Sequence, residues 1–301
     1  MPHPYERIAD ELRSRIMSGQ LAPGEPIPSA RAITREWSVA VATASRALAV
    51  LRDEGLVIAR PGLGTVVVGR PTRTRRIRDV SDAEISADRV LAVAIDIADA
   101  EGLSAVSMRR IAIELAVPTM ALYRRIRGKN SLLQLMVDTI LGQVQLPENP
   151  PPGWRPQLEL VARLQWAGYR QHPWLARLVS MTRPAVLPNG MLHTEWALSA
   201  VDGLAITPNT MLHMAVNLFA YVRGSATNLE MELESEHETG LTDEQWLESR
   251  GADFARVVAS GRYPQLARVI AAPGVDLDVD TLFDFGLERL LDGYAALIDH
   301  N

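Results

Sequence analysis

The sequence predicts a mainly α-helical chain with one small β-hairpin near its N-terminus. Apolar residues recur every three or four positions along most of the 301 residues, which is the spacing of amphipathic helices. Strand-like runs are confined to residues 56–59 and 65–68, on either side of a glycine-containing turn. The order of these elements divides the chain into four predicted segments. They are residues 1–70, 71–84, 85–131 and 132–301.

The composition excludes several classes of protein. Hydrophobic residues make up 47% and charged residues 22%, which is typical of a globular chain. The absence of cysteine excludes disulfide scaffolds, cysteine zinc sites and thiol catalysis. No apolar run approaches the length of a membrane span, and no signal-peptide pattern is present, so we expect a cytoplasmic protein without a membrane partner. Phosphate loops, dinucleotide fingerprints and nucleophile elbows are also missing, which argues against an enzyme.

The net charge of −5 is distributed unevenly along the chain. Residues 1–80 carry 13 arginines against 8 acidic residues, a net charge of +5. Residues 81–131 are neutral, and residues 132–301 carry a net charge of −10. Of the 31 basic residues, Lys129 is the single lysine. This asymmetry indicates basic or neutral binding heads and a separate acidic body.

The first segment predicts three helices followed by the hairpin. Helical spacing covers residues 5–17, and Ser29 is a suitable N-cap for a short helix over residues 30–36. A tight break then leads to a third helix over residues 40–54 and to the two strands. Helix, helix, turn, helix and hairpin is the order of a winged helix-turn-helix.

Four motifs make this segment resemble the N-terminal domain of the GntR family of regulators. They are GQLAPG (19–24), PSAR (28–31), ALAVLRDEGL (47–56) and GLGT (62–65). The resemblance implies that the third helix enters the major groove of DNA and that the wing approaches the minor groove. The DNA contacts that it implies are Arg31, Thr43, Ser45, Arg46 and Gly64. The family often has arginine at the positions of Val41 and Ser45, so base readout should be altered here. The alternative is a head that docks onto protein or binds phosphate without specificity.

Residues 71–84 predict a basic linker. Five arginines lie within residues 70–78, and the stretch has no periodicity. The arginines either follow DNA phosphates or belong to a solvated tether.

The segment 85–131 predicts a second helix-turn-helix, with an amphipathic helix over residues 86–101 and short helices over 108–115 and 119–125. A long helix follows over 131–144. The run from Met108 to Leu133 (MRRIAIELAVPTMALYRRIRGKNSLL) resembles the DNA-binding domain of the TetR family. The resemblance implies a recognition helix over 118–124. It also implies contacts to phosphates or base edges from Thr119, Tyr123 and Arg124, and a phosphate held by Lys129 at a helix N-terminus.

The segment 132–301 predicts an all-helical body. Helices are expected at about 154–171, 173–182, 188–203, 208–235, 242–260, 262–271 and 278–299. The motifs GWR (153–155), HPWL (172–175) and TRP (182–184), with residues 212–224, resemble the ligand-binding domain of the tetracycline-repressor branch. The resemblance implies a homodimer through a four-helix bundle of helices 208–235 and 278–299. The apolar stripes of these helices fit that bundle, and they fit ordinary core within one subunit as well.

Four tryptophans lie within 43 residues of this body, among histidines and methionines. Such a set is typical of an apolar small-molecule pocket, and also of packed helices. The predicted ligand-binding residues are Trp166, His172, Trp174, Met181, His193, Trp196, Met211, Met214 and Asn217. One metal-binding histidine position of the tetracycline repressors falls at about Val179, and valine cannot bind metal. We therefore expect no metal and no cofactor.

Together these patterns predict a ligand-responsive DNA-binding transcriptional regulator. We expect a repressor that binds a double-stranded DNA operator as a homodimer, and that an unknown small-molecule effector releases. The alternative is a sensor or protein-interaction module in which one or both heads have lost specific DNA binding.

Overall fold

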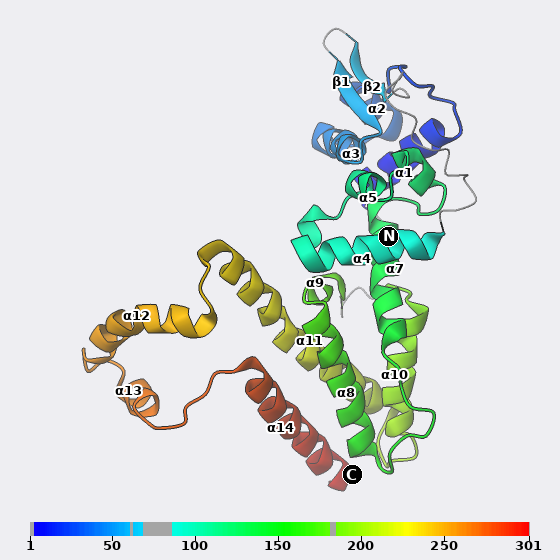
Figure 1. The fold of residues 1–301 in the computed structure, drawn as a ribbon. Helices are drawn as coiled ribbons and strands as arrows, with labels where there is room; N and C mark the ends of the chain where they lie inside the picture. Colours follow the sequence, from blue (N-terminus) through cyan, green and yellow to red (C-terminus); the bar gives the residue numbers. More distant parts are fainter. Residues whose placement is uncertain (1–2, 61–62, 69–85, 181–184, 301) are drawn as a thin grey trace. The chain divides into compact units, whose positions relative to one another are not determined.

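The computed structural model describes residues 3–60, 63–68, 86–180 and 185–300 of the chain. Within these residues the chain is helical apart from one antiparallel hairpin, which confirms the fold class (Figure 1). Its contacts divide it into two compact units, Met1–Met136 and Val137–Asn301. The linker 71–84 and the predicted ligand residue Met181 lie outside the described residues.

The winged head begins the first unit with three helices. They are α1 (Pro4–Met17), α2 (Ala30–Trp37) and α3 (Val41–Asp53). Ser29 caps α2 as predicted, because its hydroxyl accepts a hydrogen bond from the Ala32 amide at 3.3 Å. Both α1 and α2 pack on α3 around a shared apolar core. The core side chains from the three helices are Ile8, Leu12, Ile33, Ala44, Ala47 and Leu51.

The hairpin consists of β1 (Val57–Arg60) and β2 (Gly64–Val67), paired in register from Val57 opposite Val67 to Arg60 opposite Gly64. The segment before α2 also joins this wing. Residue Val67 donates its amide to the Glu25 carbonyl at 2.9 Å, and its own carbonyl accepts from the Gly24 amide at 2.9 Å. No strand is predicted for this segment, so the edge pairing is an addition.

The second head consists of α4 (Ala87–Glu101), a short 3-10 turn (Leu103–Ala105), α5 (Met108–Glu114), α6 (Thr119–Tyr123) and the start of α7 (Lys129–Gln143). The long helix begins two residues before the predicted Ser131, so Lys129 is its first residue. Both helix-turn-helix turns hold a non-glycine residue in the left-handed region, Ser38 at φ 51° and Ala116 at φ 54°. L-residues are strained in this conformation.

The second unit is an all-helical body that continues from α7. Its helices are α8 (Trp154–Gln171), α9 (Leu175–Leu178), α10 (Pro188–Ala200), α11 (Pro208–Thr239), α12 (Asp243–Val258), α13 (Pro264–Ile270) and α14 (Val279–Asp299). The prediction of a helix over 173–182 was wrong in its length. The helix ends at Leu178 because Val179 adopts an extended backbone, at φ −81° and ψ 120°.

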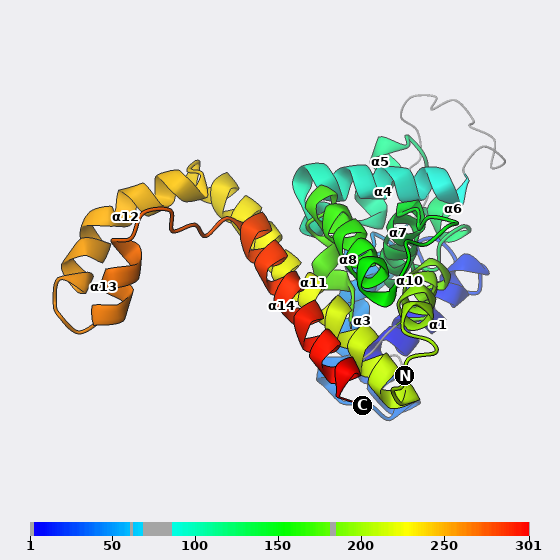
Figure 2. The same ribbon diagram turned by 90° about the horizontal axis from the view of Figure 1, so that it is seen from below.

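The centre of the body lies where α11 packs on α8, α10 and α14. The side chains of Met214, Leu218 and Val222 are at most 2% exposed, so this stripe of α11 is core within one chain. The Tyr294 hydroxyl donates to the Met214 carbonyl at 2.8 Å and ties α14 to α11. In both views α12 and α13 project away from α8, α11 and α14 (Figure 2).

Candidate nucleic-acid interface

The winged head displays its predicted DNA contacts on α2, α3 and β2. These residues are Arg31, Thr43, Ser45, Arg46 and Gly64. Three of them are exposed polar side chains, on Arg31, Ser45 and Arg46, and Thr43 is half-buried. The Arg46 guanidinium carbon lies 4.6 Å from the centre of the Tyr5 ring, so α1 holds this arginine in place. Gly64 has φ +79°, and no neighbouring atom lies within 4 Å of the position of a Cβ there. The wing edge is therefore open to a partner.

The four predicted DNA contacts of the second head differ in their exposure to solvent. Thr119 is the half-buried first residue of α6, and Arg124 is exposed directly after that helix. By contrast, Tyr123 is only 6% exposed and Lys129 is half-buried. Lys129 lines a cleft that the winged head also lines, and Arg13 of the winged head lies near the Tyr123 ring.

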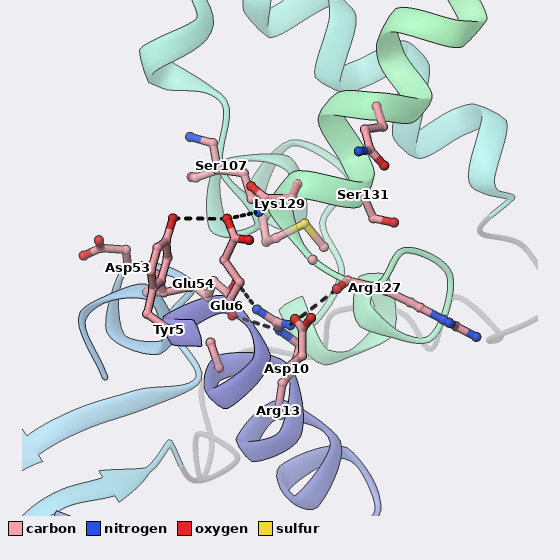
Figure 3. A pocket seen from close by; sticks show the side chains of 16 residues that line it. Tyr5, Glu6, Asp10, Arg13, Asp53, Glu54, Ser107, Arg127, Lys129 and Ser131 are labelled. Carbon is pink, nitrogen blue, oxygen red and sulfur yellow. Dashed lines mark hydrogen bonds and ion pairs between the residues drawn. The ribbon is translucent and has the colours of Figure 1, made fainter. Parts of the chain in front are cut away.

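The two heads enclose a cleft of about 720 Å³ (Figure 3). The winged head contributes residues of α1 between Tyr5 and Arg13 and the C-terminal end of α3. The second head contributes the start of α5 and the start of α7. The charged side chains that line the cleft are Glu6, Asp10, Arg13, Asp53, Glu54, Arg127 and Lys129.

A buried ion pair forms the floor of the winged side. The Arg13 guanidinium donates to Glu54 through Nε at 3.1 Å and through Nη2 at 2.5 Å. Arg13 also pairs with Asp10, and its Nη1 donates to the Arg127 carbonyl of the second head at 3.4 Å. The Arg13 and Glu54 side chains are 9% and 7% exposed, so the pair is largely removed from water. Bidentate pairing of this kind is among the stronger side-chain interactions.

Burial and charge act together on the ionisable groups of this region. Burial raises the pKa of Glu54, and the hydrogen bonds from Arg13 only partly oppose that rise. Burial opposes the charge on Arg13, but Glu54 and Asp10 hold the pKa of its guanidinium above its ordinary value. Burial and the nearby Glu54 carboxylate raise the pKa of the Tyr123 phenol, which stays protonated.

The two heads also meet along the start of α7. Gly128 has φ +116°, and a Cβ there would lie 3.1 Å from the Arg13 guanidinium carbon, so this position requires glycine. Asn130 donates through its amide to Glu6 Oε1 at 3.1 Å. The Tyr5 hydroxyl donates to the same oxygen at 3.1 Å. These contacts place a carboxylate beside the first turn of α7.

Sequence reasoning missed Arg13, Glu54, Gly128 and Asn130. Glu54 lies within the motif 47–56, and Gly128 and Asn130 lie within the run from Met108 to Leu133, but neither motif indicates a contact between the two heads. The signal that was available is the gathering of acidic residues at 6, 10, 53 and 54 within an otherwise basic head.

In the body, three of the aromatic residues predicted to bind ligand, Trp166, His172 and Trp174, are buried and already engaged. Trp166 stacks on Phe283 with ring centres 4.3 Å apart, and its indole donates to Asp280 at 2.7 Å. His172 and Trp174 are buried edge to face, with ring centres 5.9 Å apart. Trp166 therefore links α8 to α14.

The remaining predicted ligand residues are spread over α10 and α11. His193 is 2% exposed and bonds the Leu141 carbonyl at 3.1 Å and the Gln165 amide at 3.2 Å. Burial lowers the pKa of His193, which favours its neutral form. Of the others, Met214 is buried and Trp196 and Met211 are half-buried. Asn217 is exposed and donates to its own helix at the His213 carbonyl, so the structure does not bring it to the buried set.

No group of three or more histidine, aspartate or glutamate side chains among the described residues is placed to hold a metal ion. None of the helices in the described part of the chain has the length and apolarity needed to cross a membrane.

Comparisons with known proteins match both parts of the chain. Residues 146–298 match the model of the tetracyclin repressor-like C-terminal domain, and residues 4–67 match the model of bacterial regulatory proteins of the gntR family. The chain is 40% identical over 220 residues to the HTH-type transcriptional repressor DrrR1 of Streptomyces coeruleorubidus, which covers 71% of this chain and 78% of the relative. It is 29% identical over 228 residues to an HTH-type transcriptional regulator of Saccharopolyspora erythraea, which covers 75% of this chain and 90% of the relative.

A solved structure shares the fold. The TetR family protein ActR of Streptomyces coelicolor, in complex with actinorhodin, superposes with a TM-score of 0.58 at 28% identity. The match covers 72% of this chain and 98% of ActR.

Two helix-turn-helix heads on a helical body, together with these matches, define a ligand-responsive DNA-binding transcriptional regulator. The chain belongs to the TetR family, with a tetracyclin repressor-like C-terminal domain, and its N-terminal head is of the GntR type.

Proposed function

We propose that the chain is a homodimeric repressor whose second head binds a double-stranded operator through α6 and the start of α7. The observation that carries this proposal is the arrangement around Ala116. The turn there separates α5 from α6, with the half-buried Thr119 at the first position of α6 and Arg124 exposed just after it. Lys129 adds an ammonium at the first residue of α7, where free backbone amides favour a phosphate. The winged heads add flanking contacts through Arg31 and the α3 helix.

The exposed apolar surface of the body supports the dimer. After the internal packing of α11 and α14, several large apolar side chains on these helices are still more than a third exposed. They are Leu212, Val216, Leu282, Phe285 and Leu297. The same two helices from a second copy would cover this surface, and burial of apolar area would drive the association.

The effector is an organic small molecule that binds in the body. ActR, in its structure with actinorhodin, gives an example of such a ligand in a related protein. The stack of Trp166 on Phe283 connects α8 to α14, so a ligand that separates these rings would move a helix of the dimer surface. Release of DNA requires that the ligand bind the non-binding arrangement more tightly. The chain acts in this way by binding rather than by catalysis, and it acts in the cytoplasm, where its operator lies.

A second function, a sensor whose heads no longer bind DNA, is favoured by one observation. Lys129 lines a cleft that the winged head also lines, and the Arg13 guanidinium carbon of the winged head lies 5.8 Å from the centre of the buried Tyr123 ring. If that contact were permanent, the second head would have no DNA face.

The test is a salt titration of DNA binding by the full chain. Fluorescence anisotropy with a random duplex gives the slope of log affinity against log salt. Lys129→Ala should reduce that slope by about one unit and weaken binding across all sequences. The matched control is Arg268→Ala, which removes one exposed positive charge from α13 and should leave the slope unchanged. An unchanged slope in Lys129→Ala would contradict the proposed role of the second head.

A further inference from the structure

The winged head rests on the surface of the second head that the proposed function assigns to DNA. Tyr123 is 6% exposed, and its hydroxyl is one of two buried side-chain oxygens in the described residues that have no hydrogen-bond partner. The Arg13 guanidinium carbon lies 5.8 Å from the centre of the Tyr123 ring. A phenol enclosed in this way has no access to a phosphate. The contact therefore withdraws a residue of the DNA face while the heads are together.

The charges on the two sides of the cleft are complementary. The winged head is basic as a whole, yet Glu6, Asp10, Asp53 and Glu54 all face the cleft. Across from them lie Arg127 and Lys129 of the second head. Half of the 8 acidic residues of positions 1–80 are thus gathered on this one side.

One of these carboxylates occupies a position suited to a phosphate. Glu6 Oε1 accepts from Asn130, the second residue of α7, at 3.1 Å. Negative groups are stabilised at a helix N-terminus by the free amides and the helix dipole. Figure 3 shows Glu6 beside Lys129 in this corner of the cleft. A DNA phosphate that approaches the first turn of α7 would meet the Glu6 carboxylate there.

We propose that the winged head is an intramolecular competitor of DNA, because its α1 carboxylates occupy the phosphate-binding face of the second head. This inference rests on the proposed function, since it assumes that the face binds DNA. DNA reaches Tyr123 and Lys129 only after displacing the winged head. The apparent affinity of the second head is therefore reduced by the fraction of molecules in which the heads are apart. Engagement of the winged head by its own DNA site would release this inhibition.

The first test neutralises the acidic face. Glu6→Ala/Asp10→Ala should weaken the docked state and raise affinity for a random duplex about tenfold, if one molecule in about ten is undocked beforehand. The control is Glu11→Ala/Glu36→Ala, which removes the same charge from the same head. Glu11 and Glu36 both pair with Arg15 and do not line the cleft. The gain should disappear when Lys129→Ala is added to the first pair. Equal gains in the two pairs would overturn the competition.

The second test locks the heads together. The chain contains no cysteine, so Glu6→Cys/Asn130→Cys introduces the only two thiols, on side chains that touch in the structure. A short reducible bis-methanethiosulfonate linker should join them in high yield in the free protein. The joined chain should bind a random duplex at least about tenfold more weakly than the same chain after reduction. The Glu11→Cys/Asn130→Cys pair should join poorly.

The outcomes separate the inference from the proposed function. Failure to join the thiols, or equal affinity of the joined and reduced chains with the same dependence on Lys129, overturns the competition alone. If neither Thr119→Ala nor Lys129→Ala changes the affinity of the reduced chain, the proposed function fails and the competition fails with it.

Discussion

The Arg13–Glu54 pair gives the sharpest prediction about the winged head. Its two hydrogen bonds of 3.1 and 2.5 Å join side chains that are 9% and 7% exposed. Arg13→Met leaves Glu54 buried without its partner, and this should cost about 3–5 kcal/mol of local stability. Glu54→Leu should cost a similar amount. The double variant Arg13→Met/Glu54→Leu replaces the pair with apolar groups and should cost at most about 1 kcal/mol, so the two changes are strongly non-additive.

The effect of pH provides an independent check. Burial already raises the pKa of Glu54 above its ordinary value of 4.5, and the loss of Arg13 should raise it further. An acid whose pKa is higher in the folded state gains stability as the pH falls through that folded value. The Arg13→Met variant should therefore recover stability below that pKa, down to about 4.5. The variants that lack Glu54 should not.

Amide hydrogen exchange of the full chain measures these costs within the winged head. Peptides from α1 and α3 report its opening free energy without requiring the other helices to unfold. Additive costs in the double variant, or destabilisation of Arg13→Met that is independent of pH, would refute the reasoning.

Three further predictions concern other parts of the chain. Because burial lowers the pKa of His193, the body should lose stability as the pH falls below the ordinary value of 6.5, and His193→Gln should remove this loss in urea unfolding curves; equal loss in the variant would exclude His193 as its source. Ala116→Gly should relieve a left-handed residue and stabilise the second head by about 0.5–1 kcal/mol, whereas Ala112→Gly within α5 should destabilise it by a similar amount; the same sign in both, by hydrogen exchange, would contradict this. Phe285→Glu should convert the dimer into monomers in analytical ultracentrifugation while Arg268→Glu should not, and a dimeric Phe285→Glu chain would remove the proposed interface.

The local elements could be predicted from the sequence because their signals are local. Ser29, Ser86 and Ser107 accept hydrogen bonds at the starts of α2, α4 and α5 as N-caps do. The apolar spacing of the helices then determines which face each of them buries. These two kinds of signal were sufficient for both helix-turn-helix motifs and for the helical body.

The contact between the two heads could not be predicted in this way. It joins Arg13 to Arg127, which lie 114 positions apart, through polar groups that have no periodicity. Tyr123 is assigned to DNA by its position in the motif of a recognition helix. A local motif carries no information about another domain that buries the same residue. The burial of Trp166 and of the α11 stripe could not be predicted either, because it depends on which helices pack against each other.

The DNA face of the second head, and its competition with the winged head, are tested most directly by amide hydrogen exchange of the full chain with and without a DNA duplex at low salt. DNA should protect residues 119–130, at α6 and the start of α7. At the same time α1 of the winged head should lose protection around Glu6 and Asp10, because DNA displaces it from the second head. Unchanged exchange in residues 119–130 would contradict the assignment of the DNA face. Protection there with unchanged exchange in α1 would contradict the competition between the winged head and DNA.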